Sequence, residues 1–235
     1  MARPSDPSAR ERIIEVATRL FADRGYTGTT TRAIAGEVGA NIATVRYHVG
    51  GKFDLFRAVL ERLYREEIGV LSECLQPLRD LPITDSRELI DALVDVANAM
   101  IDLMASRPER PRLYLRRWLD PVDEIRPLEI RMSLDEHRLL RELLERAKTT
   151  GAIDPAFPVN TFLRSFTWLI YGYFATGPID WEQWFSDPLD PRHLQDLRRL
   201  VEQYIRRSFE SSWSATTAGC GGSGHQREAS PPEDR

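Results

Sequence analysis

The residues best suited to contact another molecule lie in one short stretch, Gly39–Lys52, which reads GANIATVRYHVGGK. Apart from the amide of Asn41, its polar side chains are one hydroxyl, one guanidinium, one phenol, one imidazole and one ammonium group, on Thr44, Arg46, Tyr47, His48 and Lys52. Groups of these types contact the phosphates and base edges of nucleic acids. The flanking glycines leave room for a helix of about two turns. Because a core helix of ordinary length would not be cut so short, we expect this segment to face another molecule.

Two short helices joined by a tight turn would hold these side chains in place. Thr30 and Asn41 are residue types that cap helix N-termini, and we predict helices over about Thr31–Val38 and Ile42–Val49. Gly39 between them allows the positive φ of a turn. This is the helix-turn-helix arrangement, whose second helix lies in the major groove of DNA and presents its N-terminal residues to base edges.

A longer helix is expected on each side of this pair. The first runs from about Pro7 to Arg24 and ends at Gly25, a typical helix C-terminus. The other begins at Gly51 or Lys52 and continues toward Leu78. The two glycines that precede Lys52 are predicted to turn the backbone sharply, so that Lys52 and the new helix N-terminus face a phosphate backbone.

The charge is distributed unevenly along the chain. The first 65 residues hold 11 Arg and Lys against 7 Asp and Glu, whereas the remainder hold 21 against 29, within a formal net charge of -4. This asymmetry fits a segment that meets phosphate, attached to a larger part that does not.

The stretch TTTRAIAGEVGANIATVRYHVGGKFDLF resembles the DNA-binding end of the TetR/AcrR-type transcriptional regulators, over about residues 9–60. The resemblance implies base contacts by five residues: Arg32, Ile42, Ala43, Thr44 and Arg46. It implies phosphate contacts by another five: Thr30, Thr31, Tyr47, His48 and Lys52. Three alternatives stay open. Tyr47 could instead pack against the first helix, and Arg32 and Arg46 could contact either bases or phosphates or remain solvated.

Helical spacing dominates the rest of the chain as well, so we predict an all-α fold. Asp85 and Glu88 have the spacing of a capping box before a helix that continues through Met104. Further helices are expected from Pro108, over 128–150 with a stop at Gly151, over 159–176 and over 191–213. The resemblance implies that this larger part is a helical ligand-binding and dimerisation domain, and that its last two helices pair with their copies in a homodimer. The expected units are residues 1–52, which bind DNA, 53–213, which bind the effector and dimerise, and 214–235, a disordered tail.

Candidate ligand-binding residues are aromatic, methionine and histidine side chains of this larger part. They are Met100, Met104, Tyr114, Trp118, His137, Trp168 and Tyr171. Side chains of this kind at helical spacing are more often plain core. Five arginines could recognise an acidic effector, although we favour the interpretation that most of them are solvated or paired with the many carboxylates: Arg107, Arg110, Arg112, Arg116 and Arg117. The segment DWEQWF, 180–185, could be a lid or an apolar loop.

The sequence gives little support to catalysis, metal binding or a membrane span. G-x-S-x-G, H-E-x-x-H and Gly-rich phosphate-loop patterns are missing, and the four histidines are scattered. We therefore expect no enzyme, no metal and no cofactor, and two unpaired thiols, Cys74 and Cys220. No apolar run reaches the roughly 18 residues of a membrane span, so we expect a cytoplasmic protein.

Together these observations predict a homodimeric transcriptional regulator, most simply a repressor, that binds a palindromic operator in double-stranded DNA. A small-molecule effector would release it. Two alternatives remain: a dimer of the same type that is controlled by a protein partner or by no ligand, and an interaction protein that does not bind DNA. The effector, the operator and the choice between repression and activation are not encoded in any motif of the sequence.

Overall fold

The computed structural model describes residues 7–79, 81–119, 122–180 and 184–210 of the 235-residue chain. Helices account for nearly all of the regular structure. In chain order they are α1 (Pro7–Gly28), α2 (Thr31–Val38), α3 (Ile42–Val49), α4 (Lys52–Leu75), a 3-10 turn (Gln76–Leu78), α5 (Ser86–Ser106), α6 (Glu109–Leu119), α7 (Arg126–Thr149), α8 (Val159–Thr176) and α9 (Pro191–Glu210). Two strands of two residues each, β1 (Ile179–Asp180) and β2 (Trp184–Phe185), pair antiparallel between α8 and α9. The predicted all-α class is confirmed, with this short pair as its one addition in the described part.

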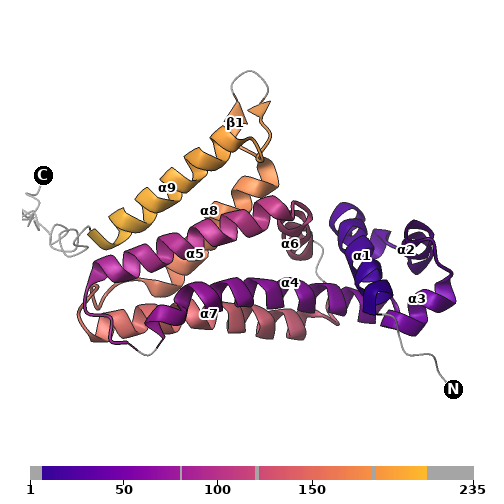
Figure 1. Ribbon diagram of the computed structural model, residues 1–235, viewed down its shortest axis with the longest axis horizontal. Coiled ribbons are helices and arrows are strands. Elements are labelled where there is room, and N and C mark those ends of the chain that lie inside the picture. Colours follow the sequence, from indigo (N-terminus) through magenta and orange to yellow (C-terminus); the bar gives the residue numbers. More distant parts are fainter. Residues whose placement is uncertain (1–6, 80, 120–121, 181–183, 211–235) are drawn as a thin grey trace, which may run out of the picture.

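The molecule is elongated, and its N-terminal helices form one end of it. Helices α1, α2 and α3 lie together at that end, and α2 and α3 are the outermost (Figure 1). Helix α4 runs from them into the body, where it lies along α7 (Figure 1). Helices α5, α8 and α9 complete the body, and α6 lies between the body and α1 (Figure 1).

Most helix ends follow the local signals in the sequence. The bounds of α2, α3 and α8 coincide with the predicted ones. Helix α1 extends past the predicted stop to Gly28, but it is interrupted at Gly25, where φ is 70°. The side chain of Asp85 does cap α5, yet it accepts from the backbone N–H of Arg87 at 2.8 Å and not from that of Glu88, as a capping box requires.

Two hydrophobic cores divide the molecule. The first joins α1, α2 and α3 to the first half of α4, and it includes Leu55, Val59 and Leu63. Leu113 of α6 and Ile125 of the segment before α7 also belong to this core. The second core joins the rest of α4 to α5, α7, α8 and α9. Helix α4 therefore takes part in both cores, on either side of Tyr64, and the expected unit boundary at residue 52 falls at its first residue.

The link between α8 and α9 turns at Gly177. Its φ is 73°, and a Cβ there would lie 2.4 Å from the carbonyl oxygen of Ser186, so glycine is required. Residues 181–183 of the candidate lid, the helical residues predicted at 211–213 and the predicted tail lie outside the described residues. Within the described ranges, no helix combines the length and apolar character needed to cross a membrane.

Candidate nucleic-acid interface

The turn between α2 and α3 is built from two caps and one glycine. The hydroxyl of Thr30 accepts from the backbone N–H of Ala33 at 3.1 Å and so caps α2. The amide oxygen of Asn41 accepts from both the backbone N–H and the hydroxyl of Thr44, at 2.7 and 2.9 Å. Gly39 between the two caps has φ 72° and ψ 31°, the left-handed conformation that glycine adopts without strain. The residues predicted to cap and turn therefore do so.

Helix α3 presents different residues to the core and to the solvent. Val45 is completely buried and Val49 is nearly so, and both belong to the N-terminal core. Ala43, Arg46 and Tyr47 are exposed, and the Tyr47 side chain is 60% exposed. These exposed side chains can contact another molecule while the core residues of α3 stay in place.

Three other residues of α3, two predicted to contact bases and one predicted to contact a phosphate, are less free than the sequence suggests. Ile42 is half-buried and packs against the N-terminal core, so its side chain is partly committed to the fold. The hydroxyl of Thr44 is used in the cap of its own helix. His48 is half-buried, its ring lies edge-on to that of Tyr47 at 5.2 Å, and its buried Nδ1 forms no hydrogen bond within the described part of the chain.

Helix α2 contacts α3, and its start carries three further predicted contacts. Thr30 and Arg32 are exposed, and Thr31 is half-buried. The first backbone N–H groups of a helix have no partner within the helix and favour an anion. The arrangement can therefore bind a phosphate at α2 while α3 contacts the bases next to it.

The two glycines before α4 are not equivalent. Gly50 has φ 78°, and a Cβ there would lie 2.6 Å from the carboxylate of Asp54, which accepts from the Gly51 N–H at 3.0 Å. Gly51 has φ -77°, which any residue can adopt. The turn therefore requires glycine at position 50, whereas at position 51, the N-cap of α4, another residue could adopt the same φ. Helix α4 then begins at Lys52.

The ammonium group of Lys52 is held by the protein itself. Its Nζ lies 4.4 Å from the centre of the Tyr26 ring and donates to the carbonyl oxygen of Thr27 at 3.4 Å. Burial lowers the pKa of Lys52. The Lys52 side chain is thus directed from the first turn of α4 toward the last residues of α1.

Helix α6 connects this end of the molecule to the body through its arginines. Arg116 donates to the carbonyl oxygens of Ala22, at 2.8 Å, and of Asp23, where the first segment of α1 ends. Arg112 pairs with the carboxylate of Asp23 at 3.3 Å. Arginines at a helix C-terminus satisfy its unpaired carbonyls and complement its dipole.

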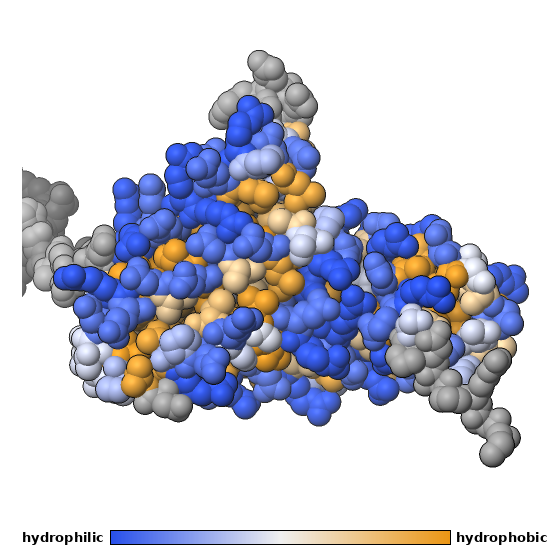
Figure 2. Space-filling view, viewed as in Figure 1, coloured by the Kyte–Doolittle hydropathy of each residue, from blue (hydrophilic) through white to orange (hydrophobic). Residues whose placement is uncertain are grey.

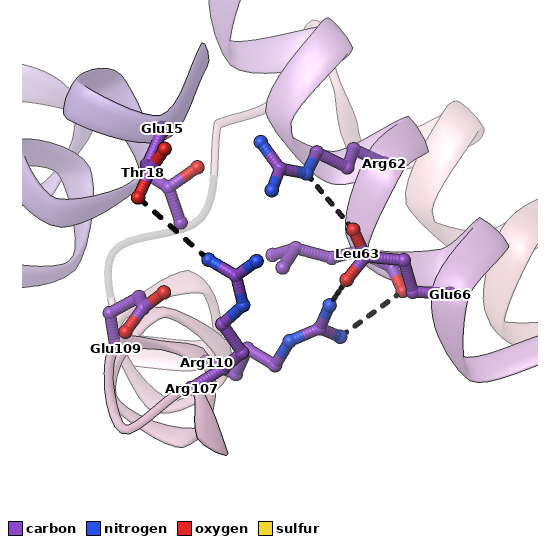
Figure 3. Close-up of a pocket in the computed structure, with 8 residues that line it drawn as sticks. All are labelled: Glu15, Thr18, Arg62, Leu63, Glu66, Arg107, Glu109 and Arg110. Carbon is purple, nitrogen blue, oxygen red and sulfur yellow. Dashed lines mark hydrogen bonds and ion pairs between the residues drawn. The ribbon is translucent and has the colours of Figure 1, made fainter. Parts of the chain in front are cut away.

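A buried ionic cluster holds α6 against α4. Arg110 is 1% exposed and pairs with Glu66 and, at 3.4 Å, with Glu67, which is completely buried. The hydroxyl of Tyr114 donates to Glu67 at 2.5 Å. Figure 3 shows Arg110 of α6 directed toward Glu66 of α4, while Arg107, which lies between α5 and α6, is directed toward Glu15 of α1. The interpretation that these arginines pair with carboxylates holds for Arg107, Arg110, Arg112 and Arg117.

Of the candidate ligand residues, four lie in the body core and two at its surface. Met100, Met104, Tyr114 and Tyr171 are buried in one cluster, and the last two rings meet edge-on at 4.8 Å. Trp168 is 41% exposed, and His137 is half-buried, with Nδ1 2.7 Å from the carbonyl oxygen of Ser133. The Trp118 side chain lies outside the described residues. The structure therefore does not gather these residues around one site.

Sequence reasoning missed the buried ionic cluster between α4 and α6. It gave Glu67 no role, because a glutamate at a helical position is usually solvated. One signal was available: Glu67 follows Leu63 and Tyr64 and precedes Leu71, at the spacing of the apolar face of α4. A carboxylate on an apolar face requires a cation from another element.

Comparisons with known proteins agree with this geometry. Residues 13–59 match the family model described as bacterial regulatory proteins, tetR family. The chain is 28% identical over 210 residues to the HTH-type transcriptional repressor AcnR of Corynebacterium glutamicum, which covers 85% of this chain and 94% of the relative. It is also 24% identical over 187 residues to the HTH-type transcriptional repressor KstR2 of Mycolicibacterium smegmatis, covering 77% and 87%. A regulatory protein of the tetR family from Rhodococcus RHA1 superposes with a TM-score of 0.66 at 20% identity, covering 87% of this chain and 98% of that one.

Proposed function

We propose that this chain is a DNA-binding transcriptional regulator of the TetR type, and that it acts as a homodimeric repressor that binds a palindromic operator and leaves it when a small molecule enters the body. The observation that carries the proposal is the exposed face of α3 at the outer end of the molecule, next to the capped start of α2. Because its DNA target is the chromosome, we expect it to act in the cytoplasm.

The proposed DNA contacts divide by position. The exposed side chains of Ala43 and Arg46, with Thr44 beside them, would face base edges in the major groove. Arg32, at the start of α2, and Ile42, whose side chain packs partly against the N-terminal core, would contact bases at the edge of this group. Phosphates would bind at the second set of residues predicted from the sequence: Thr30, Thr31, Tyr47, His48 and Lys52. Lys52 would exchange its contact with the carbonyl of Thr27 for a phosphate oxygen.

The proposed dimer is supported by an open groove between α8 and α9. It has a volume of about 510 Å³ and is lined by apolar residues that include Phe162 and Tyr204, together with Leu200, which is 53% exposed. On the face seen in Figure 2, apolar patches lie over the body beside the mostly hydrophilic outer surface of α9. A second copy that covered this groove would form a symmetric pair with two α3 helices, one for each half of a palindrome.

The proposed release is supported by the way in which α6 and α4 are joined. Arg116 holds the end of the first segment of α1, while Arg110 holds α4 through Glu66 and Glu67. A ligand that moved α6 against α4 would therefore move the DNA-binding end as well. Such a ligand acts by binding one arrangement of these helices more tightly than the other.

Selection of bound sequences from a random DNA pool, followed by footprinting at several salt concentrations, tests the proposal. We expect an inverted repeat, and we expect Arg46→Ala to reduce the preference at specific bases. Lys52→Ala should lower the slope of log affinity against log salt by about 2 per dimer, since each lost phosphate contact accounts for about 0.9. Arg131→Ala, at an exposed position of α7, is the matched control and should leave the footprint unchanged. An unprotected pool, or variants that bind DNA as the parent does, would refute the proposal.

A further inference from the structure

A cavity of about 560 Å³ opens between α7 and α8. Tyr64 of α4 and Arg117 of α6 line its inner wall. Its volume lies within the range of small-molecule sites, roughly 300–1,000 Å³. In contrast to the groove between α8 and α9, it is lined by residues from both of the helices that lead to the DNA-binding end.

Positive charge predominates around this cavity. Arg117, Arg126 and Arg164 line it, against one lining carboxylate, that of Glu129. Arg117 is 7% exposed, and its Nε lies 3.4 Å from a Glu129 oxygen but forms no hydrogen bond among the described residues. Burial raises the pKa of Glu129, while Arg117 and Arg126 oppose that shift. A buried guanidinium with an unused N–H is suited to an anionic oxygen.

The same cavity has an apolar side that faces the solvent. Ile130, Leu134 and Trp168 line it and are 53%, 60% and 41% exposed, respectively. A neighbouring cavity of about 480 Å³ shares Leu134 and Arg164 with it and adds further arginines of α7. Large apolar side chains left exposed next to cations fit a molecule that has both an acidic group and an apolar part.

We infer that this cavity binds an amphipathic organic anion, with a carboxylate or phosphate group at the three arginines and an apolar part on the three exposed apolar side chains. The inference rests on the proposed function, because it names the chemical class of the effector. Arg117 donates to the hydroxyl of Tyr64 at 2.8 Å and lies over the Tyr114 ring at 4.2 Å. An anion that draws Arg117 toward the cavity changes the contact between α6 and α4 directly.

Calorimetric titration of the full chain with 1-naphthoate, 1-naphthyl phosphate and the neutral 1-naphthamide tests this inference. The carboxylate and the phosphate ester have the same rings, so the difference between them identifies the preferred acidic group. We expect at least one anion to bind about tenfold more tightly than the amide, because a hydrogen bond between charged groups is lost in the amide. Arg126→Gln and Arg164→Gln should each weaken that anion about tenfold, whereas Arg131→Gln on α7 should not. Arg117 is left intact because its removal would also disturb the buried contact to Tyr64.

Three results would overturn the inference: neither anion binds, the amide binds as well as the anions, or both arginine variants bind as the parent does. Footprinting of the same samples on the selected operator shows whether a negative result rejects only the inference about the anion or also rejects the proposed function. Protection without anion binding rejects the inference alone. Loss of protection in the parent protein, with anion binding retained, rejects the DNA role. If the parent protein both protects the operator and binds the anion, the anion should weaken the parent's footprint and leave that of Arg164→Gln nearly unchanged.

Discussion

Replacing Arg110 by methionine should lower the stability of the whole chain more than other single substitutions near the interface. Arg110 is 1% exposed and pairs with Glu66 and with Glu67, which is completely buried. Methionine would fill most of the space but leave the Glu67 carboxylate buried without its cation. Removal of one partner of a buried ion pair costs about 3–5 kcal/mol.

The effect can be measured by thermal unfolding followed by circular dichroism, at a fixed protein concentration. For a chain of this size, 1 kcal/mol corresponds to about 2–4 °C, so the expected fall in Tm is roughly 6–20 °C. Arg112→Met is the matched control on the same helix. Its side chain is 53% exposed and pairs with Asp23, so we expect a change in stability of at most about 1 kcal/mol.

A double-mutant cycle with Glu67→Gln tests the reasoning behind this number. If the cost comes from an uncompensated carboxylate, adding Glu67→Gln to Arg110→Met should restore part of the lost stability, because the amide carries no charge. The reasoning is refuted if Arg110→Met changes the free energy of unfolding by less than about 1 kcal/mol. It is also refuted if Glu67→Gln costs the same in both backgrounds.

Three further substitutions have separate expected outcomes. Gly50→Ala should destabilise the chain by about 1–3 kcal/mol because of its positive φ, whereas Gly51→Ala should change stability by less than about 0.5 kcal/mol in urea unfolding. Asn41→Ala removes the cap of α3 and should cost about 1 kcal/mol and weaken operator binding in a gel-shift assay, while equal affinity would argue against a fixed α3. Burial lowers the pKa of His137, so its neutral form is favoured in the folded chain. Stability should therefore be retained above pH about 6.5 and fall as the pH drops below it, and Tm measured from pH 7 to 5 should fall less steeply in His137→Gln.

The helix-turn-helix could be predicted residue by residue because its signals are local. A cap such as Asn41 acts on a backbone N–H three residues away, and a turn glycine such as Gly39 acts on its own φ. The capping-box spacing at Asp85 was a weaker guide, since the second backbone N–H of the helix competes with the third for the same carboxylate.

The arrangement of the body could not be predicted in the same way. Met100 and Met104 have the helical spacing that a pocket or a core would produce alike, and only the packing of α5 places them in the core. The pairing of Arg110 with Glu67 joins residues 43 positions apart, and so it depends on where α6 lies against α4. Contacts of that separation leave no periodic pattern in the sequence.

Helix α4 has 24 residues, so it is about 36 Å long and acts as a lever between the two ends of the molecule. If α4 tilted by about 5° about its C-terminal end, this length of about 36 Å would move its first turn by roughly 3 Å. In a symmetric pair both arms would swing, so the separation of the two α3 helices could change by about 6 Å against a groove repeat of about 34–36 Å. A displacement too small to disturb the packing of either core would thus be amplified into a mismatch with the period of DNA.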